Sequence, residues 1–309
     1  MAVGTVAAPR PRPGAAAVAW HAVRPFSLTV AVVPVVVATA ALVPLHAATP
    51  LTGLACLLVA VLLQAGTNAI NDAEDAGTGA DDVATAMPSL ALREGWVGPH
   101  GARLIGLACL GAAAAVGLVT ALAVGRPLLL LLGAAGAAIG WAYTAPPLRL
   151  AYRPLGELAS GLPMGLGITV GTALAEAGRV PKAVWWASVP LVLLTAGILH
   201  ANNARDREHD ALVGKRTLAT RLSPEQVVWE YRVLTAGVPV VLVAGLALRG
   251  LPWECALALV PGALAARAAV AARLGLDARQ WTGLLLRCVK LHLLTGVALT
   301  VGLLLSGIG

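Results

Sequence analysis

The stretch LTGLACLLVAVLLQAGTNAINDAEDAGTGADD, residues 51–82, decides the fold class of this chain. Its first 20 residues are uncharged and mostly apolar, and a helix of about 20 such residues crosses the roughly 30 Å hydrocarbon core of a bilayer. The residues that follow are polar and carry five carboxylates, those of Asp72, Glu74, Asp75, Asp81 and Asp82. The stretch therefore predicts a membrane helix followed by an acidic segment.

The composition extends this prediction to the whole chain. Of its 309 residues, 58% are hydrophobic and only 12% are charged, whereas soluble proteins average about 25% charged residues. Nine long apolar runs each reach the length of a span, at residues 25–48, 51–70, 101–124, 127–145, 155–176, 183–201, 232–250, 253–273 and 283–307. Because these runs are continuous rather than alternating, we expect an all-α polytopic membrane protein. One transmembrane domain should cover residues 21–309, after a disordered tail at residues 1–20.

The basic residues indicate the orientation of the nine runs. Only four of the 22 Lys and Arg residues fall in the loops after the third, fifth and seventh runs. Cytoplasmic loops are enriched in Lys and Arg, so the N-terminus and the alternate loops are expected to be cytoplasmic. This orientation places both acidic segments on the cytoplasmic side of a bacterial inner membrane. The net charge of +7 then reflects topology and contact with anionic lipid, not nucleic-acid binding.

A second acidic segment, NNARDREHD at residues 202–210, follows the sixth run. Asn71 and Asp75 are four residues apart, as are Asn202 and Asp206, and such pairs share one face of a helix. Carboxylates beside a bilayer are costly unless their charge is compensated. Mg²⁺ binds carboxylate and amide oxygens and commonly bridges them to a substrate phosphate, so the two segments predict a divalent-cation site. The alternative is that both are solvated loops with helix caps.

Basic side chains accompany the acidic segments. Arg205 lies within the second segment and Lys215 follows it, while the loop at residues 143–157 adds Tyr143 and Arg153 on the same side of the membrane. Lys and Arg neutralise the anionic oxygens of a metal-bound polyphosphate, and Arg does so bidentately. Positive-inside anchoring is the alternative interpretation of these residues.

At these residues the chain resembles the UbiA superfamily of intramembrane prenyltransferases, and within it the menaquinone-biosynthesis branch of 1,4-dihydroxy-2-naphthoate polyprenyltransferases. The resemblance rests on NxxNDxxDxxxGxD at Asn68–Asp81, YTAPPLRLAYRPLGE at Tyr143–Glu157 and HANNARDREHDALVGKRTLATRL at His200–Leu222. RPFSLT at Arg24–Thr29 is also similar to that branch. The resemblance implies a nine-span helical bundle. It also implies Mg²⁺-dependent transfer of an isoprenyl group from an allylic diphosphate to an acceptor, commonly an aromatic ring such as 1,4-dihydroxy-2-naphthoate.

The resemblance also implies roles for individual residues. Two Mg²⁺ ions would be held by Asn71, Asp72, Asp75, Asp81, Asp206 and Asp210. The diphosphate would contact Asn68, Tyr143, Arg153, Asn203, Arg205 and Lys215. The residues implied in catalysis are Asp75, Asp206, Lys215 and Tyr143. In this scheme Mg²⁺ stabilises the leaving diphosphate, and a dry cavity inside the bundle protects the allylic cation from water.

One segment departs from the branch. After the first motif the family often continues with a Gly-Pro-x-Arg-type segment, whereas this chain reads DVATAMPSLALREGWVGP at residues 82–99. That loop puts the acceptor in question, so a terpene cyclase or a prenyltransferase of specialised metabolism is an alternative. A cation-coupled transporter is a third hypothesis, although its acids would lie near mid-membrane and no predicted span centre here carries Asp or Glu.

Overall fold

The computed structural model describes residues 11–78 and 89–307, and within them every regular element is helical, as predicted. The α-helices are α1 (Ala15–Ala22), α2 (Thr29–Leu42), α3 (Pro50–Thr78), α4 (Leu90–Arg93), α5 (Pro99–Ala123), α6 (Leu128–Ala142), α7 (Gly156–Gly161), α8 (Ile168–Ala177), α9 (Lys182–Leu212), α10 (Leu218–Arg221), α11 (Pro224–Ala247), α12 (Leu259–Ala271) and α13 (Ala278–Leu305). Short 3₁₀ or π segments are η1 (Pro25–Ser27), η2 (Val43–Leu45), η3 (Leu150–Tyr152), η4 (Leu162–Gly167) and η5 (Trp253–Ala258).

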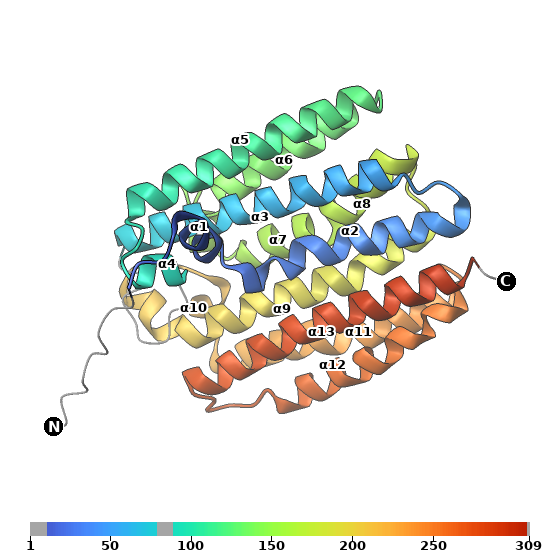
Figure 1. The fold of residues 1–309 in the computed structure, drawn as a ribbon. Helices are drawn as coiled ribbons and strands as arrows, with labels where there is room; N and C mark the ends of the chain where they lie inside the picture. Colours follow the sequence, from blue (N-terminus) through green and yellow to red (C-terminus); the bar gives the residue numbers. More distant parts are fainter. Residues whose placement is uncertain (1–10, 79–88, 308–309) are drawn as a thin grey trace.

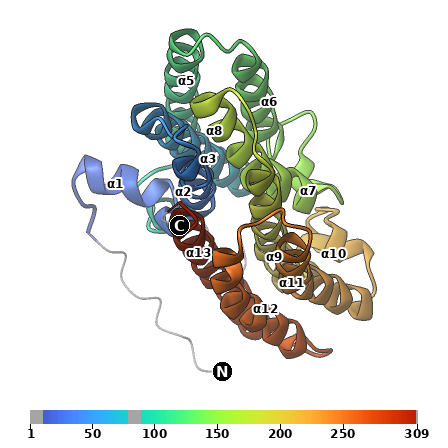
Figure 2. The same ribbon diagram turned by 90° about the vertical axis from the view of Figure 1, so that its right-hand side faces the viewer.

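Eight helical segments within the described residues are long and apolar enough to cross a membrane, which makes the chain an integral membrane protein. The all-helical membrane fold agrees with the prediction, with one difference in length at the predicted run 127–145. This run forms α6, whose 15 residues extend only about 22 Å, less than the roughly 30 Å of a hydrocarbon core. Even so, α6 lies beside α5 in both views of the bundle (Figures 1 and 2).

The helices α3 and α9 are longer than a bilayer requires. They contain 29 and 31 residues, which corresponds to about 44 and 47 Å of helix. Each therefore continues past its apolar run and carries an acidic segment on its last turns. Both helices finish at the same end of the bundle, at the left of Figure 1, close to α4 and α10. The described residues of both acidic segments are thus helical, and they lie at one end of the molecule.

The fifth predicted run is interrupted, as its glycines and proline suggest. The helices α7 and α8 are joined by the π-helical segment η4 into one span. Pro163 supplies no backbone N–H to the helical ladder, so the regular α pattern is lost there. A Cβ atom at Gly165 would lie 2.4 Å from the backbone nitrogen of Val192. Only glycine permits this approach, which brings the α7–α8 span against α9.

The helix α9 lies at the centre of the bundle, in contact with α13, α11, α2 and the α7–α8 span. Figure 2 looks along the helices and shows α9 between α8 and the group formed by α11, α12 and α13. Leu191 and Leu194 of α9 are fully buried in the main core, together with Leu242 of α11 and Leu299 of α13. Because α9 is packed on several sides, its polar last turns are held in a defined orientation.

The N-terminal region differs from the predicted tail at its end. Residues 1–10 lie outside the described residues, whereas residues 15–22 form α1. Val18 and Ala22 of α1 are buried against Ala91 and Trp96, which lie in and just after α4. Figure 1 shows α1 and α4 near the end of the bundle at which α3 and α9 finish.

Candidate active site

A cavity of about 630 Å³ extends from the acidic end of the bundle into its apolar interior. Asp75 of α3 and Asp206 of α9 line its polar end, and Trp185 lies on its wall near the start of α9. Trp185 and Asp206 are 21 residues apart in the same helix, which is about 31 Å. Most of the intervening wall is formed by Gly, Ala, Leu, Ile and Val residues. The cavity therefore suits a long ligand with a polar head and an apolar tail.

Asp75 is oriented from two directions. Asn71, one turn earlier on α3, donates from Nδ2 to Asp75 Oδ2 at 2.9 Å. The hydroxyl of Tyr152, in η3, donates to Asp75 Oδ1 at 2.7 Å. Asp75 is only 5% exposed, yet it lines the cavity. The spacing of Asn71 and Asp75 predicted a shared helix face, and both side chains lie on the same cavity wall.

Asp206 forms a bidentate ion pair with its neighbour Arg205. Arg205 Nε donates to Oδ1 at 2.7 Å and Nη2 donates to Oδ2 at 2.5 Å. Nη2 also donates to Asn202 Oδ1 at 2.9 Å. All three residues line the cavity. Charge-assisted bidentate pairs are among the strong polar contacts of proteins, so any cation that binds Asp206 competes with the Arg205 guanidinium.

Lys215 and Tyr143 complete the polar wall. Lys215 Nζ lies 3.7 Å from Asp210 Oδ1 and 5.3 Å from the centre of the Tyr152 ring. Tyr143 follows α6 and lines the cavity. Burial raises the pKa of the Tyr143 phenol well above its ordinary value, and the carboxylates of Glu157 and Asp75 add to this shift. The phenol therefore stays protonated and faces the cavity as a neutral hydrogen-bond donor.

Asn68 and Asn203 also line the cavity, but their amide groups bind the protein itself. Asn68 Nδ2 donates to the Val23 carbonyl at 2.9 Å and to Ser27 Oγ at 2.8 Å. Asn203 Nδ2 donates to Glu157 Oε1 at 2.9 Å. In this arrangement both asparagines position neighbouring segments around the polar end.

Three described residues of the predicted set, Asp72, Arg153 and Asp210, are not part of the cavity wall. Asp72 is fully buried, pairs with Arg24 and accepts from the Ser89 backbone N–H at 3.0 Å. Arg153 is exposed, and neither it nor Asp72 belongs to the cavity wall in the described structure. Asp210 is buried next to the cavity residue Lys215. Asp81 lies outside the described residues.

The predicted set of site residues lacked Arg24 and Tyr152. Arg24 lines the cavity and holds Asp72, and Tyr152 holds Asp75. Both lie in quoted motifs, RPFSLT and YTAPPLRLAYRPLGE, so a signal was present in the sequence. Glu230, which lies next to His200 in space, belongs to none of the motifs. Only packing of α11 against α9 reveals its position.

The sequence model of the UbiA prenyltransferase family matches residues 31–306. The chain is 36% identical over 257 residues to a Mycobacterium tuberculosis protein named 1,4-dihydroxy-2-naphthoate octaprenyltransferase, a match that covers 83% of this chain and 86% of that protein. A Bacillus subtilis protein of the same name is 30% identical over 236 residues, with coverage of 76% and 75%.

Solved structures agree in fold. A structure reported for digeranylgeranylglyceryl phosphate synthase gives a TM-score of 0.67 at 14% identity and covers 94% of this chain and 98% of that chain. A UbiA homologue from Archaeoglobus fulgidus, bound to DMAPP and Mg²⁺, gives a TM-score of 0.60 at 19% identity, with coverage of 91% and 98%. At these identities the likeness shows a shared helical fold.

Proposed function

The chain belongs to the UbiA prenyltransferase family, and on that premise we propose that it transfers an isoprenyl group from an allylic diphosphate to an aromatic acceptor of the 1,4-dihydroxy-2-naphthoate type. Two relatives of at least 30% identity carry the corresponding name. The observation that carries the proposal is one cavity shared by Asp75 and Asp206, which belong to acidic segments on two different helices and meet an otherwise apolar wall. In the proposed reaction the allylic C–O bond breaks and the diphosphate departs. A ring carbon of the acceptor bonds to the prenyl group and releases its own substituent, either a proton or, from a carboxylated carbon, carbon dioxide.

The donor atoms at the polar end fit Mg²⁺. Asp75 and Asp206 contribute carboxylate oxygens, and Asn71 and Asn202 contribute amide oxygens. Both carboxylate oxygens of Asp210 are buried without a hydrogen-bond partner, a costly condition that a cation relieves. Such an all-oxygen set is what Mg²⁺ prefers.

We therefore assign Asn71, Asp75, Asp206 and Asp210 as the residues that hold two Mg²⁺ ions. Bound Mg²⁺ supplies charge stabilisation to the departing diphosphate. Asp81 stays a predicted member of this set, whereas Asp72 has the separate task of fixing Arg24.

Basic side chains and a neutral hydrogen-bond donor at the polar end of the cavity would bind the diphosphate. Arg205 and Lys215 line the cavity and neutralise anionic oxygens. Arg24 joins them from the N-terminal segment, and the Tyr143 phenol adds an uncharged donor. Arg153, exposed and away from the cavity wall, would contribute only through the general positive charge of this end.

The apolar part of the cavity would bind the prenyl chain. Its wall continues along α9 to Trp185 and includes small residues such as Gly133 and Gly171, beside which a chain can pass. The same apolar surface excludes water from the reacting carbon, which protects an allylic cation from hydrolysis. The residues of this chain thus bind, orient and shield the substrate.

The test is a product analysis with purified protein. The protein is given Mg²⁺ and allylic diphosphates of several lengths, with and without 1,4-dihydroxy-2-naphthoate, and the products are identified by mass. We expect a prenylated product of the acceptor, with or without its carboxyl group, only when the acceptor is present, and no turnover after EDTA treatment until Mg²⁺ is restored. Hydrocarbon or alcohol products formed without an acceptor would instead indicate that the protein is a terpene cyclase.

Variants connect this activity to the residues. Asp75→Asn and Asp206→Asn preserve side-chain size but remove a charged oxygen, so each should abolish turnover in protein that remains folded and inserted. Turnover close to that of the wild type in either variant would refute the assigned metal site.

We further propose that the polar end faces the cytoplasm of a bacterial inner membrane and that residues 21–309 act as one transmembrane domain. The proposal is supported by the distribution of basic residues, since the loops at the opposite end carry only Arg126, Arg179, Lys182 and Arg249. A polyphosphate substrate made in the cytoplasm would then reach the polar end of the cavity directly.

A further inference from the structure

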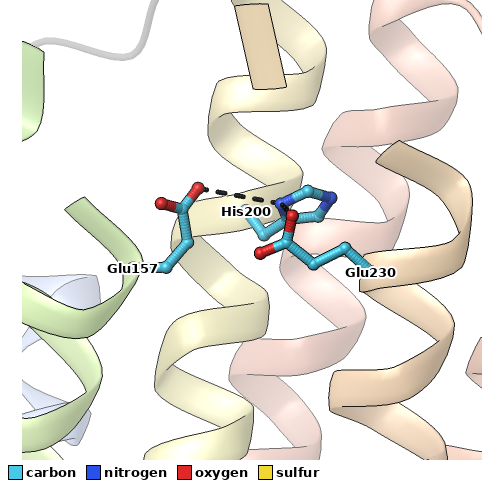
Figure 3. A group of neighbouring side chains, drawn as sticks. All are labelled: Glu157, His200 and Glu230. Atoms are coloured by element: carbon cyan, nitrogen blue, oxygen red, sulfur yellow. Dashed lines mark ion pairs between the residues drawn. The ribbon is translucent and has the colours of Figure 1, made fainter. Parts of the chain in front are cut away.

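Three ionisable side chains from three helices meet outside the cavity: Glu157 of α7, His200 of α9 and Glu230 of α11. Figure 3 shows both carboxylates directed at the same ring nitrogen of His200. One ligand atom from each residue lies within 4.8 Å of the other two. His200 is fully buried and Glu157 is 5% exposed, while the side chain of Glu230 is 17% exposed. None of the three lines the cavity in the described structure, so the group is separate from the site proposed above.

The hydrogen bonds of His200 define the state of its ring. Nε2 lies 2.8 Å from the carbonyl oxygen of Val227. Because that oxygen can only accept, Nε2 carries a proton and donates it. In a neutral ring the lone pair of Nδ1 then faces Glu157 and Glu230. Nδ1 and Glu157 Oε2 are buried and make no hydrogen bond, an arrangement that requires a positive charge between the three groups.

The distances distinguish a proton from a metal ion at this position. His200 Nδ1 lies 3.7 Å from Glu157 Oε1 and 3.4 Å from Glu230 Oε2. Both separations exceed the 2.7–3.2 Å of an N–H···O hydrogen bond. Four ligands at about 2.1 Å from a tetrahedral Zn²⁺ are instead roughly 3.4 Å from one another. Both distances from His200 Nδ1 are therefore close to the separation of neighbouring ligands around a metal.

We propose that Glu157, His200 and Glu230 bind a divalent transition cation, of which Zn²⁺ is the best match. One imidazole nitrogen and two carboxylate oxygens favour such a cation over Mg²⁺, which prefers oxygen ligands alone. Two positive charges also neutralise the two carboxylates. Outer hydrogen bonds typical of metal sites are in place: His200 donates to the Val227 carbonyl, and Asn203 donates to Glu157 Oε1 at 2.9 Å.

The cation would act on the structure rather than on the substrate. It links α7, α9 and α11, of which α7 is a short helix held at its far end by the irregular segment η4. Through Glu157 it also fixes Asn203, which lines the cavity. The cluster thus braces one wall of the prenyl cavity and holds a polar group near Asp206.

The test measures metal content in the full-length protein, purified in detergent through an affinity tag that contains no histidine. The protein is stripped with chelator, exposed to Zn²⁺, dialysed against excess Mg²⁺ and analysed by elemental mass spectrometry. We expect one Zn²⁺ to be retained per chain, both in the wild type and in the Asp75→Asn/Asp206→Asn variant. Loss of an outer hydrogen-bond partner weakens metal binding by about 10- to 100-fold, so loss of a direct ligand in His200→Gln or Glu230→Gln should weaken Zn²⁺ binding by at least about 100-fold. The matched controls His209→Gln on α9 and Glu225→Gln on α11 should retain it.

A spectroscopic measurement decides the question without any substitution. Co²⁺-loaded wild-type protein should show the intense visible bands of a four-coordinate ion, and a thermal midpoint that rises with Co²⁺ concentration. Loss of all Zn²⁺ from the wild type during dialysis would overturn the proposal, as would the weak spectrum of six-coordinate Co²⁺. Equal Zn²⁺ retention by His200→Gln, Glu230→Gln and their matched controls would also overturn it. None of these outcomes depends on prenyl transfer, so the proposed function is tested independently.

Discussion

Replacement of Tyr152 by Phe should raise the Mg²⁺ concentration that the protein needs for activity, without altering the fold. The substitution removes the hydroxyl that donates to Asp75 Oδ1 at 2.7 Å, but it keeps the ring beside Lys215 and Arg149. A hydrogen bond to a charged group contributes about 1.5–3 kcal/mol, and each 1.36 kcal/mol corresponds to about a factor of ten. Since Asn71 still holds the other oxygen, we expect the lower part of that range, about a 10- to 50-fold rise in the Mg²⁺ concentration for half-maximal activity.

The assay is the initial rate of diphosphate release at fixed substrate over a series of Mg²⁺ concentrations. Tyr231→Phe is the matched control, because its buried hydroxyl donates to the Leu284 carbonyl at 3.2 Å and lies away from the cavity. That variant should lose about 1 kcal/mol of stability and keep the wild-type Mg²⁺ dependence. A Tyr152→Phe protein with the wild-type dependence, or an equal shift in both variants, would show that Tyr152 does not act through a metal ligand.

Three further predictions concern the cavity, the buried ion pair and the orientation. Gly171→Leu should shift the preference toward shorter prenyl diphosphates in a competition assay, because a side chain there enters open cavity space, whereas Gly111→Leu, away from the cavity wall, should not. Arg24→Gln leaves Asp72 buried without its charged partner; this should cost about 3–5 kcal/mol, seen as a lower thermal midpoint that Asp72→Asn in the same chain partly restores. In a chain without native cysteines, Glu208→Cys should react with a membrane-impermeant maleimide only after cells are opened, and Arg179→Cys should react in intact cells; the reverse pattern contradicts the proposed orientation.

The all-helical membrane fold was predictable because few backbone structures are stable in lipid. Backbone groups inside a bilayer must be hydrogen-bonded within the protein, so long apolar runs such as 51–70 and 183–201 become helices. The pairing of Asn71 with Asp75 was predictable for a related reason, since four residues complete about one turn of one helix. The lengths of the helices were harder to predict from the sequence. Helices α3 and α9 continue into the acidic segments because Asp75 and Asp206 are buried by packing, not because the segments are apolar.

Residue patterns alone are enough to conclude that the chain crosses a membrane as helices and that its two acidic motifs, with basic residues close by, belong to a prenyltransferase family. Which side chains contact one another depends on how the helices pack in three dimensions. Adjacent helical residues point about 100° apart, so Asn71 lines the cavity while Asp72 turns to Arg24. Tyr152 reaches Asp75 across 77 positions of sequence, and Glu230 reaches His200 from a neighbouring helix. These contacts depend on the rotation and packing of whole helices, which residue spacing within one segment does not encode.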